Sequence, residues 1–456
     1  MQLRHLNPAA AWLAARVELA RVRYGADEFM AGPADPEAYA DPTAHGNRRL
    51  LWLDGLVSNI SESFVTSFIY PFVMALGATN GQIGAMSALT NLGAALGLMP
   101  GARLAERCNR KPVAVLTGGV AARLLLLVLA ILPLLLKPSA AIYAIIAVVA
   151  LRSMAGQLGY PAWSALVADL VPRAIRGRYF SARNIGLAIA ALLFTPLAGR
   201  IIELGGGVPG YQVAMGIAGL VGFGATAIFA RIKEPPRPLV AEAPAEKAGP
   251  GRLLTLLRSA PRFTAFTGVA FIWNLALMIA GPFFSVYLVR DLGASPTLIG
   301  ILAAVNSLGN MMGQRVWGRL NDRRGAAWVM RVTGLAIPVV PLAWSLAPGP
   351  WWLLPVEWLS GFLWAGYGLA SFNLLLSLAP EAQRPRFTAI YQMSVFGSAF
   401  VGPLLGSVLA NALTIRPLLW ISTAGRLIAS LLFLFTVRAD TESGRSAAVV
   451  TNPNTT

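Results

Sequence analysis

Apolar residues run along most of the chain in long stretches, and short polar segments separate them. A helix needs about 20 apolar residues to cross a bilayer, and stretches of that length recur from Leu50 to Val437. Charges, Gly and Pro mark their ends. The pattern predicts an all-α membrane protein with twelve transmembrane helices. We place them at 50–75, 82–101, 113–135, 140–168, 180–203, 211–231, 263–289, 296–317, 327–346, 351–379, 387–412 and 417–437.

A polar stretch, 232–262, divides these helices into two groups of six. It is rich in Pro, Glu and Arg, as a solvent-exposed connection would be. The predicted organisation has five parts: a cytoplasmic N-terminal extension (1–49), an N-terminal six-helix bundle (50–231), a cytoplasmic central loop (232–262), a C-terminal six-helix bundle (263–438) and a cytoplasmic tail (439–456).

The two halves repeat each other in sequence. Residues 76–84 read LGATNGQIG and residues 292–300 read LGASPTLIG. At the same offset of 216 residues, the stretch 104–107 (LAER) matches 320–323 (LNDR). Later, at an offset of 208, 176–179 (RGRY) matches 384–387 (RPRF). Apolar helices can look alike by chance, but here the charged connections match too. Two pseudo-symmetric six-helix bundles are an architecture of transporters.

Composition and charge narrow the class of protein to which the chain can belong. Hydrophobic residues make up 56% and charged residues 12%, against about 25% charged in soluble proteins, so a soluble enzyme is excluded. The net charge is +17. Of the 37 Lys and Arg residues, four lie in segments on one side (Lys137, Arg200, Arg290, Arg416), four lie inside apolar runs (Arg123, Arg152, Arg331, Arg426) and the rest lie on the opposite side. This is the positive-inside pattern. It accounts for the basic charge without nucleic acid and places both termini in the cytoplasm.

Several chemistries find no support in the sequence. Cys108 is the single cysteine, and His5 and His45 are the only histidines, so we expect no disulfide and no metal site. No signal peptide is recognisable. No phosphate-loop motif is present, which disfavours an ATP-driven pump. Arg outnumbers Lys strongly, as in proteins from GC-rich genomes. We therefore expect a cofactor-free protein in a bacterial inner membrane.

The loop after the second span resembles the signature of the major facilitator superfamily, Gly-x-Leu-x-Asp-Arg-x-Gly-Arg-Arg. The second copy, 318–325 (GRLNDRRG), fits well. The first, 102–111 (ARLAERCNRK), has Ala102 and Asn109 where the family has Gly, and Glu106 where it has Asp. The resemblance covers about residues 50–437 and implies transport by alternating access. It says almost nothing of the substrate.

By the same resemblance, this loop stabilises one conformation of the alternating-access cycle and moves in the other. Its acid can accept backbone N–H bonds at a helix N-terminus, and its arginines can pair with an acid at the end of the fourth span. Basic loops also stay inside without gating, so plain topology is the alternative. The gating residues expected on this basis are Glu106, Arg107, Asp169 and Arg178, with Asp322 and Arg323 in the second copy.

Charges within the bilayer are costly unless they are paired or face a cavity. Asp54, Ser58 and Glu62 share one helical face of the first span. Glu62 lies about 18 Å from Leu50 at 1.5 Å per residue, near the midplane. Arg152 lies about 26 Å from the cytoplasmic end of the fourth span. With Gly156 it partly resembles a motif of proton-coupled exporters. We expect Glu62 to carry a proton with Arg152 as its partner; a static ion pair is the alternative.

Further polar and aromatic side chains are candidates for the cavity wall, with helix packing as the alternative for each aromatic. Aromatic rings with a few amides suit an amphipathic organic molecule. Glu357 begins a polar stripe in the tenth span that continues to Trp364 and Tyr367. The full set of expected cavity residues is Asp54, Ser58, Tyr160, Trp163, Trp273, Asn274, Asn306, Asn310, Glu357, Trp364, Tyr367 and Tyr391.

Three functions stay open at this stage. The segments 195–199 (TPLAG) and 402–406 (GPLLG) partly resemble an exporter motif, which favours a proton-coupled exporter. A proton-coupled nutrient importer would use the same machinery. A non-transporting receptor or assembly factor is disfavoured, because a scaffold gains little from buried charges. We expect a monomer in the bilayer that binds a small-molecule substrate and protons.

Overall fold

The structure, a computed structural model, describes residues 42–172, 175–234, 257–380 and 384–436. Within these ranges every regular element is a helix. Most of the predicted N-terminal extension, most of the central loop and the C-terminal tail lie outside the described residues. The predicted domain bounds there stay a prediction.

Helices occupy all twelve predicted positions, several of them in pieces. The first half contains α2 (Pro42–Ser63), α3 (Ile69–Ala75), α4 (Asn80–Arg107), α5 (Arg110–Ala114), η1 (Val115–Ala121), α6 (Ala122–Leu135), α7 (Pro138–Leu170), α8 (Arg176–Gly205) and α9 (Gly207–Ala230). The second half contains α11 (Pro261–Ala280), α12 (Phe283–Val286), η2 (Tyr287–Asp291), α13 (Pro296–Arg324), α14 (Ala326–Ala336), α15 (Val339–Ser345), η3 (Pro350–Trp352), α16 (Leu353–Leu378), α17 (Arg384–Leu413) and α18 (Ile415–Thr436).

Among the described residues, ten helical segments are long and apolar enough to cross a membrane. They coincide with ten of the predicted spans, so the chain is a multi-pass membrane protein. The predicted first and eighth spans coincide with α2–α3 and α13, which are helical but carry more charge. That these two also cross the bilayer stays a prediction.

The first predicted span needs two corrections. Its helix begins at Pro42 rather than at residue 50, and α2 ends at Ser63, directly after Glu62. Residues 64–68 continue in turns until α3 begins at Ile69. The Ser63 hydroxyl donates to the Asn59 carbonyl at 2.9 Å. Such back-bonding by Ser bends helices, and hydropathy alone gives no sign of it.

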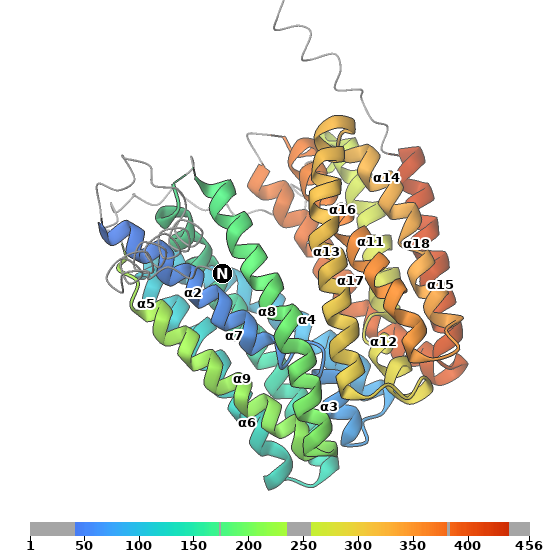
Figure 1. Cartoon of the computed structure of the whole chain (residues 1–456). Coiled ribbons are helices and arrows are strands. Elements are labelled where there is room, and N and C mark those ends of the chain that lie inside the picture. The colour runs from blue at the N-terminus through green and yellow to red at the C-terminus, as the bar shows by residue number, and fades with distance from the viewer. Residues whose placement is uncertain (1–41, 173–174, 235–256, 381–383, 437–456) are drawn as a thin grey trace, which may run out of the picture.

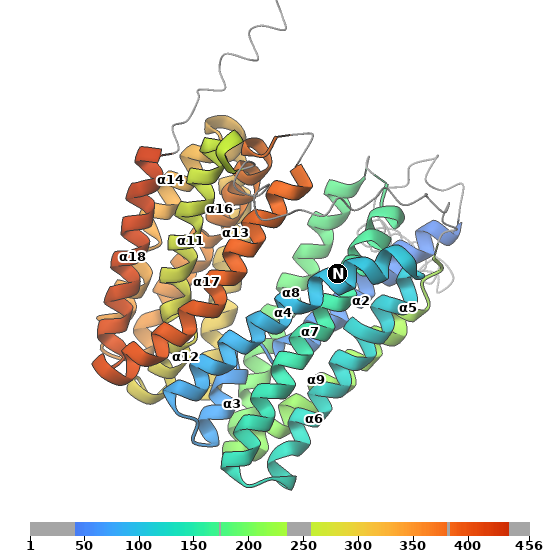
Figure 2. The same cartoon turned by 180° about the vertical axis from the view of Figure 1, so that it is seen from behind.

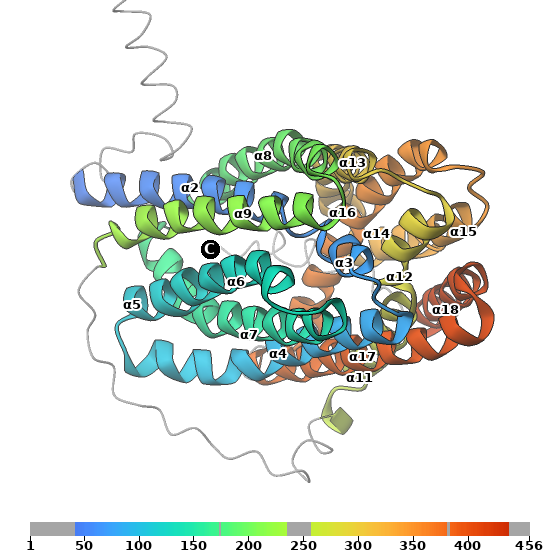
Figure 3. The same ribbon diagram turned by 90° about the horizontal axis from the view of Figure 1, so that it is seen from below.

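The helices form two groups that lie side by side. Figure 1 shows α2 to α9 in one group and α11 to α18 in the other, and Figure 2 shows the same division from behind. The end-on view in Figure 3 places α4 beside α17 and α8 beside α13, the pairs that join the groups. Buried residues from both groups form one large apolar cluster, which includes Phe68, Phe72 and Tyr287.

Repeated glycines allow this close approach between the halves. Gly84 on α4 and Gly300 on α13 are equivalent residues of the sequence repeat. A Cβ added at Gly84 would lie 2.6 Å from the Pro403 carbonyl oxygen of α17. One added at Gly300 would lie 2.5 Å from the Thr195 carbonyl oxygen of α8. The repeat glycines therefore pack against the two Pro-containing segments, 195–199 and 402–406, of the opposite half.

Polar contacts join the halves at the same end of the molecule. Arg290 donates to the Ala78 carbonyl and, at 3.0 Å, to the Asn80 side chain. The Asn80 amide in turn donates to Asn411 at 3.2 Å. The backbone N–H of Thr297 donates to Glu203 at 3.3 Å. Together these contacts close the end that the charge pattern predicts to face outward.

Candidate functional site

Glu62 lies between two arginines from two other helices. Its Oε1 accepts a hydrogen bond from Arg123 Nη1 of α6 at 2.7 Å and another from Arg152 Nη2 of α7. The side chain of Glu62 is 36% exposed, whereas those of Arg123 and Arg152 are 10% and 20% exposed. We call these three residues the Glu62 cluster. It ties α2 to α6 and α7 through one carboxylate, and it carries one more positive than negative charge.

Neighbouring small residues make room for this cluster. Gly222 of α9 faces Arg123, and Ser61 donates to the Ala218 carbonyl at 2.6 Å. Arg123 also approaches two hydroxyls, those of Ser61 at 3.5 Å and Ser58 at 3.4 Å. The guanidinium is thus held by hydroxyls as well as by the carboxylate, as a buried charge requires.

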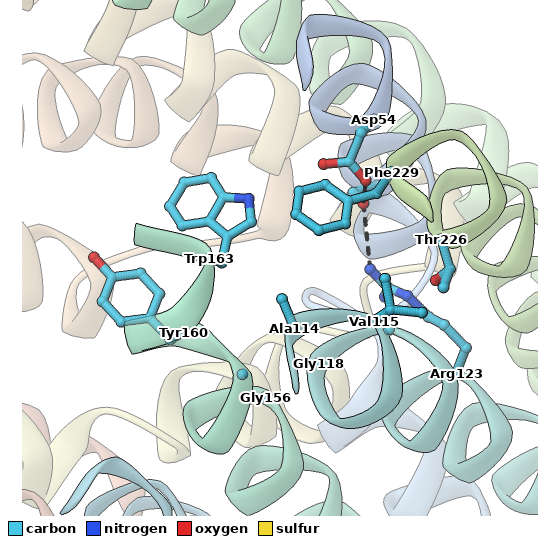
Figure 4. A pocket seen from close by; sticks show the side chains of 13 residues that line it. Asp54, Ala114, Val115, Gly118, Arg123, Gly156, Tyr160, Trp163, Thr226 and Phe229 are labelled. Carbon is cyan, nitrogen blue, oxygen red and sulfur yellow. Dashed lines mark hydrogen bonds between the residues drawn. The ribbon is translucent and has the colours of Figure 1, made fainter. Parts of the chain in front are cut away.

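A cavity of about 190 Å³ opens beside the cluster, inside the first group of helices. We call it the bundle cavity. Figure 4 shows Trp163 of α7 opposite Asp54 of α2 and Phe229 of α9, with Arg123 at one side. Tyr160 also lines it and stacks with Trp163 at 5.9 Å between ring centroids. Four expected cavity residues, Asp54, Ser58, Tyr160 and Trp163, therefore line one cavity.

A larger cavity of about 600 Å³ lies between the two groups. We call it the central cavity. It is lined from α2 by Asn59, from α8 by residues between Ser181 and Ala191, and from α13 by residues between Asn306 and Arg315. Amides and hydroxyls lie there together with Ile, Leu, Ala and Met side chains and with the guanidinium of Arg315. Of the expected cavity residues, Asn306 and Asn310 line it.

Glu357 of α16 lies directly behind this wall. Its Oε2 accepts from Asn306 Nδ2 at 2.8 Å, and its Oε1 accepts from Trp344 Nε1 at 3.1 Å. Within the described part of the chain, no arginine or lysine forms an ion pair with it. Glu357 is therefore held by neutral donors.

The other expected cavity residues of the second half contact neighbouring rings or their own helix backbone. Trp273 is 2% exposed and stacks on Tyr367 at 4.7 Å, and Trp364 meets Tyr367 edge-on. Tyr391 stacks on Phe266, and Asn274 donates to the Ala270 carbonyl of its own helix. Trp273 and Tyr367 border only a very small cavity of about 10 Å³. The prediction that Trp273 and Tyr367 line the central cavity is corrected, because their rings stack on each other and neither residue borders that cavity.

Among the residues that the structure describes, the loop predicted to gate contains one pair of the expected kind. Arg110 pairs with Asp169 at the end of α7, so the partner of Asp169 is the third basic residue of the loop 102–111. The acid that caps a helix N-terminus here is Glu234, which accepts from the N–H groups of Arg110 at 2.9 Å and Lys111 at 3.2 Å. The remaining residues expected to gate, Glu106, Arg107, Arg178, Asp322 and Arg323, are exposed.

Comparison with known proteins decides the family. A model of the Major Facilitator Superfamily matches residues 51–280 and 268–453. The chain belongs to the Major Facilitator Superfamily. It is therefore a membrane transporter of small molecules, and the resemblance of its loop motifs to this family is confirmed.

Relatives within the superfamily carry more specific names. The chain is 27% identical over 376 residues to the multi-drug resistance efflux pump PmrA of Streptococcus pneumoniae, which spans 80% of this chain and 89% of that protein. It is 27% identical over 191 residues to the multidrug resistance protein MdtG of Dickeya zeae, across 41% of this chain and 45% of that protein.

Solved structures agree on the fold of the superfamily. A mutant form of the nucleoside transporter NupG superposes with a TM-score of 0.70 at 13% identity, covering 85% of this chain and 99% of that one. A bacterial homologue of the iron transporter ferroportin in an inward-facing state gives 0.68 at 15% identity, covering 86% and 98%. At such identities the likeness concerns the fold alone.

Sequence reasoning missed three arginines of this superfamily member. Arg123 was visible as a cation inside an apolar run, a signal that marks functional candidates in membranes. Arg110 stood within a basic loop, where nothing distinguished it from its neighbours. Arg183 of α8 lies against Gly55 and over the Trp163 ring at 5.6 Å, close to Asp54. No sequence signal separates Arg183 from a charge that only sets topology.

Proposed function

We propose that this transporter exports small, amphipathic organic molecules from the cytoplasm in exchange for protons. The observation that carries the proposal is the Glu62 cluster, in which one titratable carboxylate connects three helices. We further propose that the protein acts as a monomer in the bacterial inner membrane with both termini in the cytoplasm.

Protonation of Glu62 gives the cluster two states. As a carboxylate, Glu62 accepts bonds from Arg123 and Arg152 and holds α2 to α6 and α7. A proton on Glu62 removes its charge, so the attraction to both guanidiniums weakens and the three helices are free to shift. A proton taken up on one side and released on the other would thus drive the change between conformations. Coupling requires two states of this kind, each favoured by a different ligand.

The central cavity supports an amphipathic substrate. Its lining combines the amides of Asn59, Asn184 and Asn310 with apolar side chains such as Ile185 and Met311. A wall of this kind can hydrogen-bond a polar group and cover an apolar one. The halves meet tightly at the predicted outer end, so the central cavity of this state would receive its substrate from the cytoplasm. The names of the PmrA and MdtG relatives support export.

The test uses purified full-length protein in liposomes with a pH gradient imposed across the membrane. Ethidium, a planar lipophilic cation, and a panel of amphipathic acids and zwitterions serve as probes. We expect gradient-driven accumulation of at least one probe by the wild type and none by Glu62→Gln. Asp291→Asn, a neutralised acid at the predicted outer end, serves as the control and should transport normally. Accumulation by Glu62→Gln equal to that of wild type would refute the carrier role.

A further inference from the structure

Two separate cavities flank α2, and Glu62 lies about one helical turn beyond the residues of α2 that line them. Ser58 lines the bundle cavity and Asn59 lines the central cavity. Glu62 is four residues from Ser58 and three from Asn59, so it shares a helix face with each. We propose that protons pass between Glu62 and the cytoplasm through the bundle cavity, by way of Asp54, while the substrate uses the central cavity. This inference rests on the proposed function of Glu62.

A chain of polar groups runs along the bundle cavity from Asp54 to Glu62. Ser58 donates to Asp54 Oδ1 at 3.5 Å, and Arg123 Nη2 donates to Ser58 Oγ at 3.4 Å. The same guanidinium donates to Glu62 through Nη1 at 2.7 Å. Asp54 and Glu62 are two helical turns apart, about 12 Å at 1.5 Å per residue. That distance is too long for direct transfer, so water must carry the proton between the carboxylates.

The bundle cavity has the size and lining that such water needs. A water molecule occupies about 30 Å³ in the liquid, so about 190 Å³ holds several. Asp54, Ser58, Arg123 and Thr226 supply polar partners along its wall. It begins near the predicted cytoplasmic ends of its helices, where Ala114 follows the loop after α4 and Phe229 is the last residue but one of α9. The cavity therefore extends from the cytoplasmic side toward Glu62.

The charges around this route favour the passage of protons over the binding of an organic cation. Three arginines face the two carboxylates: Arg123 of α6 lies near both, Arg152 of α7 faces Glu62, and Arg183 of α8 faces Asp54. An organic cation in the bundle cavity would meet this excess of positive charge. A proton moves by exchange of O–H bonds: Asp54 accepts it from bulk water, passes it to cavity water, and Glu62 receives it from that water. The reverse sequence returns it to the cytoplasm.

Separate routes would give an exchanger a practical advantage. In an antiporter the proton must leave Glu62 to the cytoplasm as the substrate enters from there. If both used the central cavity, a bound substrate would block the water that receives the proton. The bundle cavity lies within one group of helices, so a substrate between the two groups leaves it open.

The experiment follows the protonation of Glu62 without any substrate. Full-length protein in liposomes is subjected to a rapid pH step, and the C=O band of protonated carboxyl groups is recorded by time-resolved infrared difference spectroscopy. Glu62→Gln identifies the band of Glu62. Gly156 lines the bundle cavity, and a Cβ added there meets nothing within 4 Å. Gly156→Leu therefore places a side chain in the bundle cavity. Gly224→Leu, at another open position that lines neither cavity, is the matched control. Ala188→Leu narrows the central cavity instead.

We expect Asp54→Asn and Gly156→Leu each to lower the rate at which the Glu62 band changes after the pH step by about tenfold or more. A tenfold change in rate corresponds to about 1.4 kcal/mol on a barrier. Gly224→Leu and Ala188→Leu should leave the rate unchanged. If the Glu62 band keeps its rate in Asp54→Asn and Gly156→Leu, or is slowed by Ala188→Leu alone, the route is wrong while the proposed function stands. If no band disappears in Glu62→Gln, the carrier role itself fails, and the route fails with it.

Discussion

Replacing Gly300 by Ala should shift the transporter away from the conformation seen here. Gly300 of α13 faces α8 of the other half, and an added Cβ would lie 2.5 Å from the Thr195 carbonyl oxygen and 2.8 Å from Pro196 Cα. An ordinary contact is 3.4 Å or more, so the two backbones must separate by about 0.9 Å. Both obstructing atoms belong to backbone, and no side-chain rotation can relieve the clash.

The magnitude follows from the cost of overpacking, about 1–3 kcal/mol for an added methylene in a tight contact. That cost applies only to conformations in which α8 and α13 touch. At about 1.4 kcal/mol per factor of ten, Gly300→Ala should lower the population of this state by about 5- to 150-fold relative to an outward-open one. Gly84→Ala, at the equivalent residue of the repeat, should act in the same direction.

The assay measures the distance between two spin labels at the predicted cytoplasmic ends of the halves. Arg103 and Arg319 are equivalent exposed positions on α4 and α13, and both are labelled as cysteines after Cys108→Ser. Gly300→Ala should enrich the shorter distances, because the cytoplasmic ends approach when the outer end opens. Gly224→Ala, which meets nothing within 4 Å, is the control. A folded Gly300→Ala protein with the same distance distribution as Gly224→Ala would refute the reasoning.

Three further experiments test other contacts. Glu62→Gln and Arg123→Gln, combined in a double-mutant cycle, should show a coupling of about 0.5–3 kcal/mol in thermal unfolding; purely additive effects would deny the contact. Glu357→Leu removes the acceptor of Trp344 Nε1, while Asn306 keeps the Glu357 backbone carbonyl at 3.2 Å. It should therefore lower the unfolding free energy by about 1–3 kcal/mol in denaturant titrations; Asp291→Asn, which removes no such acceptor, should not. Asp169→Asn should change stability by less than about 1 kcal/mol, because the Asp169 side chain is 50% exposed. It should nevertheless slow probe transport in liposomes; unchanged transport would assign the pair with Arg110 to topology alone.

The sequence predicted the order of the helices because hydropathy is an additive property of each segment. Apolar length and charge placement locate ten of the spans within a few residues. They could not locate the end of α2 at Ser63, which depends on a local hydroxyl bond. They also could not fix the start of that helix, since residues 42–49 are too polar to be assigned to a span.

The site was predictable in part. Helical periodicity places Asp54, Ser58 and Glu62 on one face of the first predicted span. The bundle cavity and the Glu62 cluster lie along that face. Which helices face each other is a matter of tertiary packing, so Arg123 could be recognised as a candidate but not as a partner of Glu62. The same limit explains Trp273 and Tyr367, whose spacing fitted a cavity wall but whose rings stack on each other.

The role of Glu62 is tested most directly by separating exchange from gradient-driven transport in one set of liposomes. Counterflow of labelled against unlabelled probe needs the change between conformations but no net proton movement, whereas accumulation against a gradient needs both. We expect Glu62→Gln to retain counterflow and to lose accumulation, with proton influx falling to the level of empty liposomes. Accumulation and proton influx both preserved in Glu62→Gln would show that another group carries the proton.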